Sequence, residues 1–194
     1  MAVLASGTGT ILEAILDAGV PVAVVLADRP CRALDVAAAA GVETVLVDRR
    51  EWGGFGRAFD RHGYTEALTA ALVARAVDLV CMAGFGTVLD APVHDAFPGR
   101  ILNTHPSLLP AFPGWHAVRD ALAAGAAESG CTVHVATLEL DAGPVLAQEA
   151  VPVRAGDTPE ALHERIKAVE RRLYPETIRR VLAAHGQLAG RSTR

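Results

Sequence analysis

The sequence lacks the signals that mark exported and membrane-inserted chains. Its first residues, MAVLASGTGT, contain no basic segment followed by a long apolar one, and no apolar run approaches the roughly 18 to 20 residues that a membrane-spanning helix needs. Cysteine is also scarce, because Cys31, Cys81 and Cys131 form an odd, widely spaced set without a CxxC pair. That usage is typical of a reducing compartment. We therefore expect a cytoplasmic protein with no membrane partner.

A strong excess of charge of one sign is absent as well. The chain has 18 Lys and Arg residues against 22 Asp and Glu residues, and no basic run interrupts it. Nucleic acids are bound by concentrated positive charge, so the sequence predicts no nucleic-acid partner. With 51% hydrophobic residues and a mean hydropathy of +0.29, the 194 residues favour one well-buried domain. A small molecule is the expected partner.

Short apolar segments alternate with segments of helical length through the first two thirds of the chain. The apolar segments are rich in β-branched residues, as in parallel strands that are buried on both faces. The pattern predicts an α/β fold of the Rossmann type, in which a mostly parallel sheet carries helices on both faces. Strands are expected near residues 2–5, 22–28, 43–48, 78–84 and 100–105, and helices near residues 9–18, 32–40, 57–75 and 115–124.

The last third follows a different pattern. Residues 131–141 alternate with period two, DAGP reads as a turn, and residues 144–153 continue extended. This predicts a partly antiparallel pair of strands at the C-terminal end of the sheet. Asp157 or Thr158 can then cap a long helix whose apolar spacing runs to Pro175.

No linker, internal repeat or low-complexity segment divides the chain. We therefore predict a single domain over residues 1–186. The polar, small residues that follow predict a disordered tail over residues 187–194.

The segment SGTGT follows the first strand and opens the first helix. Small residues here let main-chain N–H groups approach an anion, and the helix start adds the positive end of a dipole. The segment lacks the third glycine of a dinucleotide-binding motif and the lysine of a Walker A loop. From the residues alone, a phosphate site and an ordinary tight turn are equally compatible with it.

Asn103 and His105 stand two positions apart at the end of a strand. Side chains at that spacing share a face, and open α/β sheets bind ligands beyond the carboxyl ends of their strands. Farther on, His134 and Asp141 flank an extended segment. Each residue also has a plain structural explanation, since Asn and Asp hydrogen-bond turns and a histidine can be buried in the core. No HxxxH or cysteine spacing accompanies them, so we expect no metal site.

Taken together, these segments resemble the folate-dependent formyltransferase family. NTHPSLLPAFPG is close to that family's Asn-x-His-Pro-Ser-Leu-Leu-Pro-x-x-Pro-Gly signature, and TVHVATLELDAGPVLAQ follows at the expected distance. SGTGT, FDRHGY and ERIKAVERRLYP add further matches. The resemblance covers almost the whole chain, and the combination of Asn, His and Asp is specific as a set.

The resemblance implies transfer of a formyl group from 10-formyltetrahydrofolate to the primary amine of glycinamide ribonucleotide, a step of de novo purine biosynthesis. It assigns catalysis to Asn103, His105 and Asp141. Asn103 and His105 would hold the negative charge that develops on the formyl oxygen. Asp141 would orient His105 and move a proton through a water. The co-substrate is the folate, and no metal is needed.

The resemblance also assigns the binding residues, while it leaves a homodimer open. The residues for the ribonucleotide are Gly9, Thr10, Ile11, Arg61, His134 and Glu170. Those for the folate are Gly86, Thr87, Val88, Leu89, Leu140 and Ala142.

Two places depart from the family pattern. Ile11 replaces the usual Asn, and residues 86–89, Gly-Thr-Val-Leu, replace the usual Met-Arg-Ile-Leu. Recognition through main-chain groups would survive both changes. Three alternatives stay open: another folate-dependent N-formyltransferase, a deformylase, and an inactive ligand-binding homologue. Relatives that act on tRNA or that hydrolyse the folate carry a further domain, for which this chain shows no segment.

Overall fold

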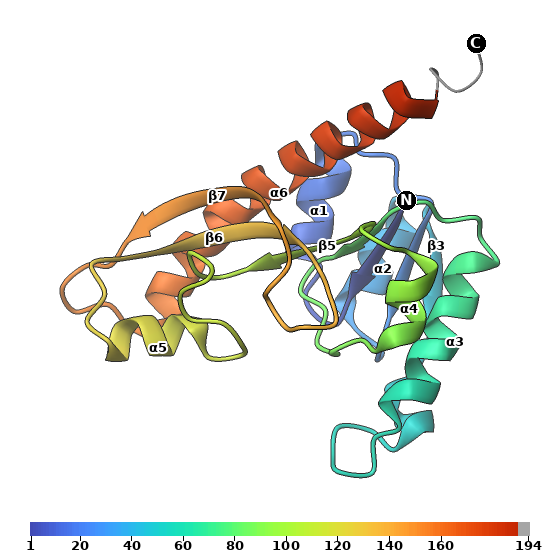
Figure 1. Ribbon diagram of the computed structural model, residues 1–194, viewed down its shortest axis with the longest axis horizontal. Helices are drawn as coiled ribbons and strands as arrows, with labels where there is room; N and C mark the ends of the chain where they lie inside the picture. Colours follow the sequence, from blue (N-terminus) through green and yellow to red (C-terminus); the bar gives the residue numbers. More distant parts are fainter. Residues whose placement is uncertain (190–194) are drawn as a thin grey trace.

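The computed structural model describes residues 1–189 and shows one sheet of seven strands between two layers of helices (Figure 1). The strand order is β3-β2-β1-β4-β5-β6-β7, parallel from β3 to β5 and antiparallel for β5–β6 and β6–β7. This confirms the predicted fold class. The strands are β1 (Ala2–Ala5), β2 (Val24–Ala27), β3 (Glu43–Leu46), β4 (Val80–Met82), β5 (Ile101–His105), β6 (Glu128–Val135) and β7 (Val145–Pro152).

The helices divide between the two faces of the sheet, as Figure 1 shows for α1 and α6 on one side and α3 and α4 on the other. None of the described helices is long and apolar enough to cross a membrane. The helices are α1 (Thr10–Asp17), α2 (Arg32–Ala39), α3 (Arg61–Val73), α4 (Ala91–Ala96), α5 (Ala117–Ala123) and α6 (Pro159–Ala189), and a short 3₁₀-helix, η1, spans Arg49–Trp52.

Each face of the sheet has its own hydrophobic core. Val3 of β1 packs with Leu12 of α1 and Ile166 of α6 on one face, whereas Leu4 packs with Leu68 of α3 on the other. Successive side chains of a strand point to opposite faces, so a strand covered on both sides must be apolar throughout. All four residues of β1 are fully buried, which explains the unbroken run AVLA.

One helix boundary and one helix of this region differ from the prediction. The third helix begins at Arg61 rather than near residue 57, because the Asp60 carboxylate accepts a hydrogen bond from the N–H of Gly63 and caps the helix there. The short helix α4 was not predicted. Six residues carry too little periodicity, although Asp90 caps its start by accepting the N–H of Ala91.

The C-terminal third of the structure differs more from the prediction than the rest does. Strand β6 covers Glu128–Val135, so the alternation predicted for residues 131–141 ends early and the rest forms a loop. Helix α6 continues past Pro175 to Ala189 instead of ending at the proline. Ile178, beyond the proline, is completely buried in the core with α1, so tertiary packing stabilises the helix despite the missing N–H. The predicted tail begins within α6 at residues 187–189, and its residues 190–194 lie outside the described part of the chain.

Candidate active site

A cavity of about 400 Å³ lies beyond the carboxyl ends of β1, β4 and β5. These strands are neighbours, and the strand order runs toward β2 and β3 on one side of β1 and toward β4 and β5 on the other. Open α/β sheets bind ligands at such a switch point, because the loops that follow the two strands separate there. The loop after β1, the turn after β4 and the end of β5 line the cavity, together with residues of α6 and of the loop after β6.

The loop between β1 and α1 brings main-chain N–H groups to this cavity. Gly9 adopts a φ of +78° just before Thr10, the first residue of the helix. A Cβ at position 9 would lie 2.9 Å from the Cα of Ala33 in α2. The backbone conformation and the close approach therefore both require glycine. Since the first N–H groups of a helix have no partner within it, the loop can bind an anion.

Asn103 is held by a histidine on the neighbouring strand. The two residues face each other in the β5–β6 register, and Nδ2 of Asn103 lies 3.3 Å from Nε2 of His134. The other ring nitrogen, Nδ1, lies 3.1 Å from the carbonyl oxygen of Val135. A carbonyl can only accept, so Nδ1 carries the proton and Nε2 accepts from Asn103. Burial lowers the pKa of His134 and favours this neutral ring. Asn103 therefore keeps a second N–H for a ligand.

His105 lies between a carbonyl group and a carboxylate. Its Nε2 is 2.8 Å from the carbonyl oxygen of Phe112, so Nε2 carries a hydrogen. Its Nδ1 is 3.4 Å from Oδ2 of Asp141, and both side chains are buried. A lone pair on Nδ1 would face the negative carboxylate, whereas a proton at that place attracts both groups. The ring nitrogen and the carboxylate are therefore placed to exchange a proton.

Asp141 reaches this position through an unusual loop conformation. Its φ of +56° lies in the left-handed region, which is rare for residues other than glycine. The N–H of Gly114 donates to Oδ2 of Asp141 at 2.8 Å. Two residues later, Gly143 passes so close to β6 that a Cβ would lie 1.8 Å from the carbonyl oxygen of Val135. The DAGP segment is thus a turn that also directs a carboxylate at His105.

Helix α6 contributes a carboxylate and a cation to the same cavity. The hydroxyl of Thr104 donates a short hydrogen bond to Glu170, and burial raises the pKa of that carboxyl group. Lys167 lies about one helical turn before Glu170 and also lines the cavity. Sequence reasoning missed Lys167. Its signal was visible, since it is the only lysine of the chain and stands three positions from Glu170.

A second cavity of about 360 Å³ adjoins the first, with which it shares Gly86, Val88 and Trp115. Its other lining residues are aromatic or cationic. The guanidinium carbon of Arg49 lies 3.8 Å from the ring centroid of Phe59. Such a wall suits a ligand that is both aromatic and negatively charged. The remaining lining residues are Arg49, Phe55, Phe59 and Arg61.

Most of the residues that the resemblance assigned line the first cavity: Gly9, Thr10, Ile11, Gly86, Thr87, Val88, Asn103, His105, Leu140, Asp141 and Glu170. Four do not. Arg61 lines the second cavity and lies 3.7 Å from the carboxylate of Asp90. Leu89 is buried in the core, His134 is buried against Asn103, and Ala142 is exposed on the loop after β6. The binding roles of these residues stay predictions.

Two further residues were missed because they act through main-chain groups. The carbonyl of Phe112 holds His105, and the N–H of Gly114 holds Asp141. Main-chain groups are the same at almost every residue, so the sequence could not indicate these two contacts. Among the side chains of residues 1–184, which the structure describes, no group of three or more His, Cys, Asp or Glu is placed to hold a metal ion.

Comparison with known proteins agrees with this geometry. A family model described as formyl transferase matches residues 1–178. A phosphoribosylglycinamide formyltransferase of Mycobacterium tuberculosis is 47% identical over 191 residues, which are 96% of this chain and 86% of that protein. The trifunctional purine biosynthetic protein adenosine-3 of Gallus gallus is 38% identical over 195 residues, which are 97% of this chain and 19% of that protein.

A solved structure has the same fold. Glycinamide ribonucleotide transformylase 1 of Symbiobacterium toebii superimposes with a TM-score of 0.84 at 47% identity, over 92% of this chain and 84% of that chain. The family-model match to residues 1–178 extends from β1 into the last helix, so it includes every segment that lines the cavity. By sequence and by structure, the chain belongs to the formyl transferase family.

Proposed function

We propose that this protein is a phosphoribosylglycinamide formyltransferase, which transfers the formyl group of 10-formyltetrahydrofolate to the primary amine of glycinamide ribonucleotide. The observation that carries the proposal is the meeting of Asn103, His105 and Asp141 in one cavity that also contains the main-chain loop at Gly9. The names of the similar proteins support the acceptor and the place in purine biosynthesis.

The loop at Gly9 suits the phosphate of the ribonucleotide. The N–H groups at the start of α1 and the positive end of its dipole favour an anion. Lys167 lines the same cavity and adds a full positive charge. The side chain of Ile11 is almost fully buried, so this residue can serve a ligand only through its main chain. The replacement of a polar residue at position 11 therefore leaves the phosphate donors in place.

The turn after β4 and the loop after β6 suit the folate. Leu140 and Val88 give the cavity apolar walls, and no hydrogen bond within the described residues occupies the main-chain groups of Val88. Those groups are free to pair with the polar edge of a pterin. The adjoining cavity then faces the aromatic and carboxylate portion of the same molecule, for which Arg49 and Arg61 provide positive charge.

The chemistry requires a group that stabilises negative charge. When the acceptor amine attacks the formyl carbon, a carbon–nitrogen bond forms and the formyl oxygen becomes an oxyanion. The second N–H of Asn103 is available for it, because the first is fixed on His134. A well-placed donor of this kind contributes about 2.7 to 4 kcal/mol to stabilising the transition state. The bond from carbon to the folate nitrogen then breaks.

Proton transfer completes the reaction. The attacking amine loses one proton and the departing folate nitrogen gains one, so the two products are a formamide and tetrahydrofolate. Nδ1 of His105 lies 3.4 Å from Oδ2 of Asp141, and both side chains line the same cavity as Asn103. This pair, with a water beside Asp141, is placed to pass the proton, which is worth roughly 10²- to 10⁴-fold in rate.

A spectroscopic assay with 10-formyltetrahydrofolate tests the proposal. The protein is mixed with the folate and either glycinamide ribonucleotide, an amino-sugar nucleotide or no amine. We expect loss of the formyl group only with glycinamide ribonucleotide. Reaction without an amine would identify a deformylase, and preference for the amino sugar would identify a different N-formyltransferase. Absence of reaction in all three mixtures, with the folate still bound, would identify a ligand-binding homologue.

A further inference from the structure

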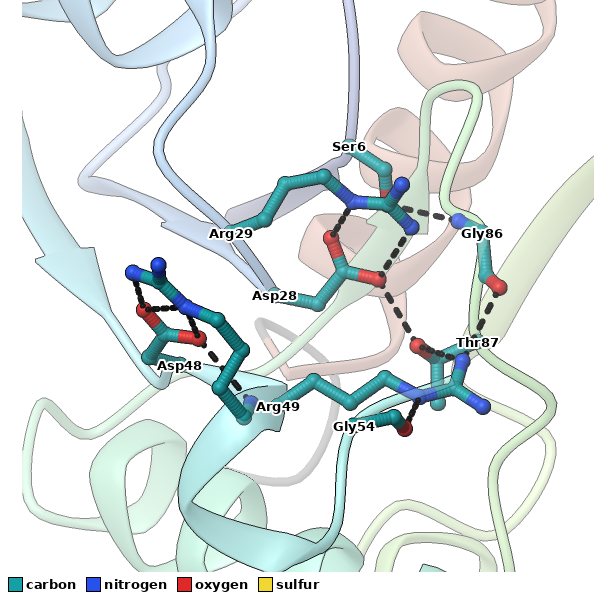
Figure 2. A network of polar contacts seen from close by, with 9 residues as sticks. Ser6, Asp28, Arg29, Asp48, Arg49, Gly54, Gly86 and Thr87 are labelled. Carbon is teal, nitrogen blue, oxygen red and sulfur yellow. Dashed lines mark hydrogen bonds and ion pairs between the residues drawn. The ribbon is translucent and has the colours of Figure 1, made fainter. Parts of the chain in front are cut away.

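The turn of residues 83–88 between β4 and α4 has no regular secondary structure, yet it lines both cavities. Its shape must therefore be set by contacts from outside the turn. Figure 2 shows these contacts as one continuous network that joins Ser6, Asp28, Arg29 and Arg49 to Gly86 and Thr87. These residues come from the ends of β1 and β2 and from η1, so three elements hold the turn.

Both polar groups of Gly86 are held by side chains. Its N–H donates to the hydroxyl of Ser6 at 2.6 Å, and its carbonyl oxygen lies 3.4 Å from Nη1 of Arg49. A Cβ at this position would lie 2.9 Å from Nη2 of Arg29. A residue larger than glycine would thus displace the guanidinium group. The network therefore requires glycine at position 86.

Thr87 forms the centre of the network. Its hydroxyl donates to Oδ2 of Asp28 at 2.8 Å and accepts from Nη1 of Arg49 at 2.9 Å. The side chain is 1% exposed, so water cannot replace either partner. A single hydroxyl thus donates to a carboxylate and accepts from a guanidinium group at the same time, which a valine of the same shape could not do.

The buried carboxylate of Asp28 holds the hydroxyl of Thr87 in place. The carboxylate is completely buried. It accepts hydrogen bonds from Nε of Arg29 at 3.0 Å and from Nη2 of Arg29 at 3.2 Å, as well as from the hydroxyl of Thr87. A buried charge must keep its hydrogen-bond partners, because each lost partner leaves desolvated charge uncompensated. The carboxylate therefore fixes the hydroxyl, and the hydroxyl fixes the main chain of the turn.

Arg49 connects the turn to the second cavity. Its Nε donates to the carbonyl of Gly54 at 2.8 Å, and its guanidinium group stacks over the rings of Phe55 and Phe59. Thr87 is therefore linked by one side chain to the aromatic wall of that cavity. A shift of the hydroxyl would move the turn and the wall together.

We propose that Thr87 is a positioning residue for the formyl donor, which it serves by fixing the main chain of residues 86–88 through Asp28 and Arg49. The inference rests on the proposed function in one respect, namely that the folate lies against this turn. Thr87 acts through the turn and not on the reacting atoms. Its loss should therefore weaken binding of the folate and leave the chemical step nearly unchanged.

Three variants test the inference by calorimetric titration with 10-formyltetrahydrofolate, by the Michaelis constants of both substrates and by thermal unfolding. Thr87→Val removes the hydroxyl and keeps the shape, and Thr87→Ser restores the hydroxyl. Thr177→Val is the matched control, because Thr177 is also buried but lies on α6, where its hydroxyl donates to the carbonyl of Leu173. It lines neither cavity.

We expect Thr87→Val to raise the dissociation constant of the folate roughly tenfold, which corresponds to one hydrogen bond to a charged group. The kcat and the Michaelis constant for glycinamide ribonucleotide should change by less than about twofold, and Thr87→Ser should bind folate nearly as the wild type does. Thr177→Val should lower the unfolding temperature without weakening folate binding.

Unchanged folate binding in Thr87→Val, or an equal loss in Thr177→Val, would overturn the inference. A wild-type protein that binds folate but does not formylate glycinamide ribonucleotide would overturn the proposed function alone, since the binding comparison would still hold. A wild-type protein that binds no folate would overturn both.

Discussion

The two halves of the cavity present different kinds of chemistry. The half built from β1 to β4 offers mainly main-chain groups, at Gly9, Thr10 and the turn around Gly86. The half built from β5 to β7 offers side chains, and Asn103, His105 and Asp141 each hold a defined partner there. One half is suited to binding and the other to reaction.

This difference explains where the sequence departs from the family pattern. Ile11 and Thr87 lie in the half that works through the main chain, where a new side chain can be accommodated if the backbone keeps its path. The reacting half keeps Asn103, His105 and Asp141, whose proposed roles as oxyanion donor and proton carriers depend on these particular side chains. Substitutions in the two halves should therefore have different kinetic effects.

The largest effect is expected for Asp141→Asn. The amide can still accept from the N–H of Gly114, so the loop should hold, but an amide oxygen cannot take up and release a proton as a carboxylate does. We expect kcat to fall by roughly 10²- to 10⁴-fold, with both substrates still bound. Steady-state kinetics and titration of each substrate measure this.

Asp157→Asn is the matched control for that substitution. Asp157 pairs with Arg165 near the start of α6, and this pairing lowers its pKa to about 2, but it lines neither cavity. Its replacement should change the unfolding temperature and leave kcat alone. Normal turnover in Asp141→Asn would remove Asp141 from the reacting half.

The next largest effect is expected for Asn103→Ala. The substitution removes the N–H that faces the ligand, and we expect kcat to fall by roughly 10²- to 10³-fold, as for the loss of one oxyanion donor. The Michaelis constants should change far less, because this contact strengthens only in the transition state. A rise in the Michaelis constants with normal kcat would place Asn103 among the binding groups and blur the distinction between the halves.

Much of the fold followed from the sequence, because its elements obey local rules. The apolar runs of β1 and β2 depend on neighbouring residues only, and both strands were predicted. The continuation of α6 past Pro175 did not follow. It depends on the burial of Ile178, which is a tertiary contact that no local pattern reveals.

Single side chains of the site could be predicted from the sequence, but the contacts between them could not. The spacing of Asn103 and His105 placed both on one face of a strand, and the structure agrees. The pairing of Asn103 with His134 required the register of β6, which lies 31 residues away. The network around Thr87 requires knowledge of the whole topology, since Asp28 reaches it from the end of β2 and Arg49 from η1. Such contacts are set by topology and have no sequence period.

A smaller effect is expected for Gly9→Ala in the binding half. The substitution imposes a left-handed conformation on a residue with a Cβ and pushes that atom against Ala33. We expect about 1 to 2 kcal/mol of lost stability from the conformation and a roughly tenfold rise in the Michaelis constant for glycinamide ribonucleotide, at nearly normal kcat. Thermal unfolding and steady-state kinetics measure the two effects.

Gly19→Ala separates these contributions. Gly19 also has a positive φ, of +69°, but a Cβ there would meet no atom within 4 Å, and the residue lies outside the cavity. It should lose stability without a change in either Michaelis constant. A fall in kcat for Gly9→Ala alone would show that the loop takes part in the reaction and not only in binding.

The smallest effect concerns Glu170, a side chain of α6 that lines the cavity next to Lys167. Burial raises the pKa of Glu170 above its ordinary value of 4.5 in the folded protein. The folded state therefore holds a proton that the unfolded chain has released, and the free energy of unfolding falls as the pH rises from about 4.5 through the folded pKa.

Glu170→Gln stays neutral and still accepts a hydrogen bond from the hydroxyl of Thr104, so its free energy of unfolding does not fall in this way. We expect its unfolding temperature to match the wild type near pH 4 and to exceed it near pH 8. A lower unfolding temperature at pH 8 would mean that the positive charges of Lys167 and Arg171 stabilise the ionised carboxylate, and the α6 wall of the cavity would then depend on charged side chains.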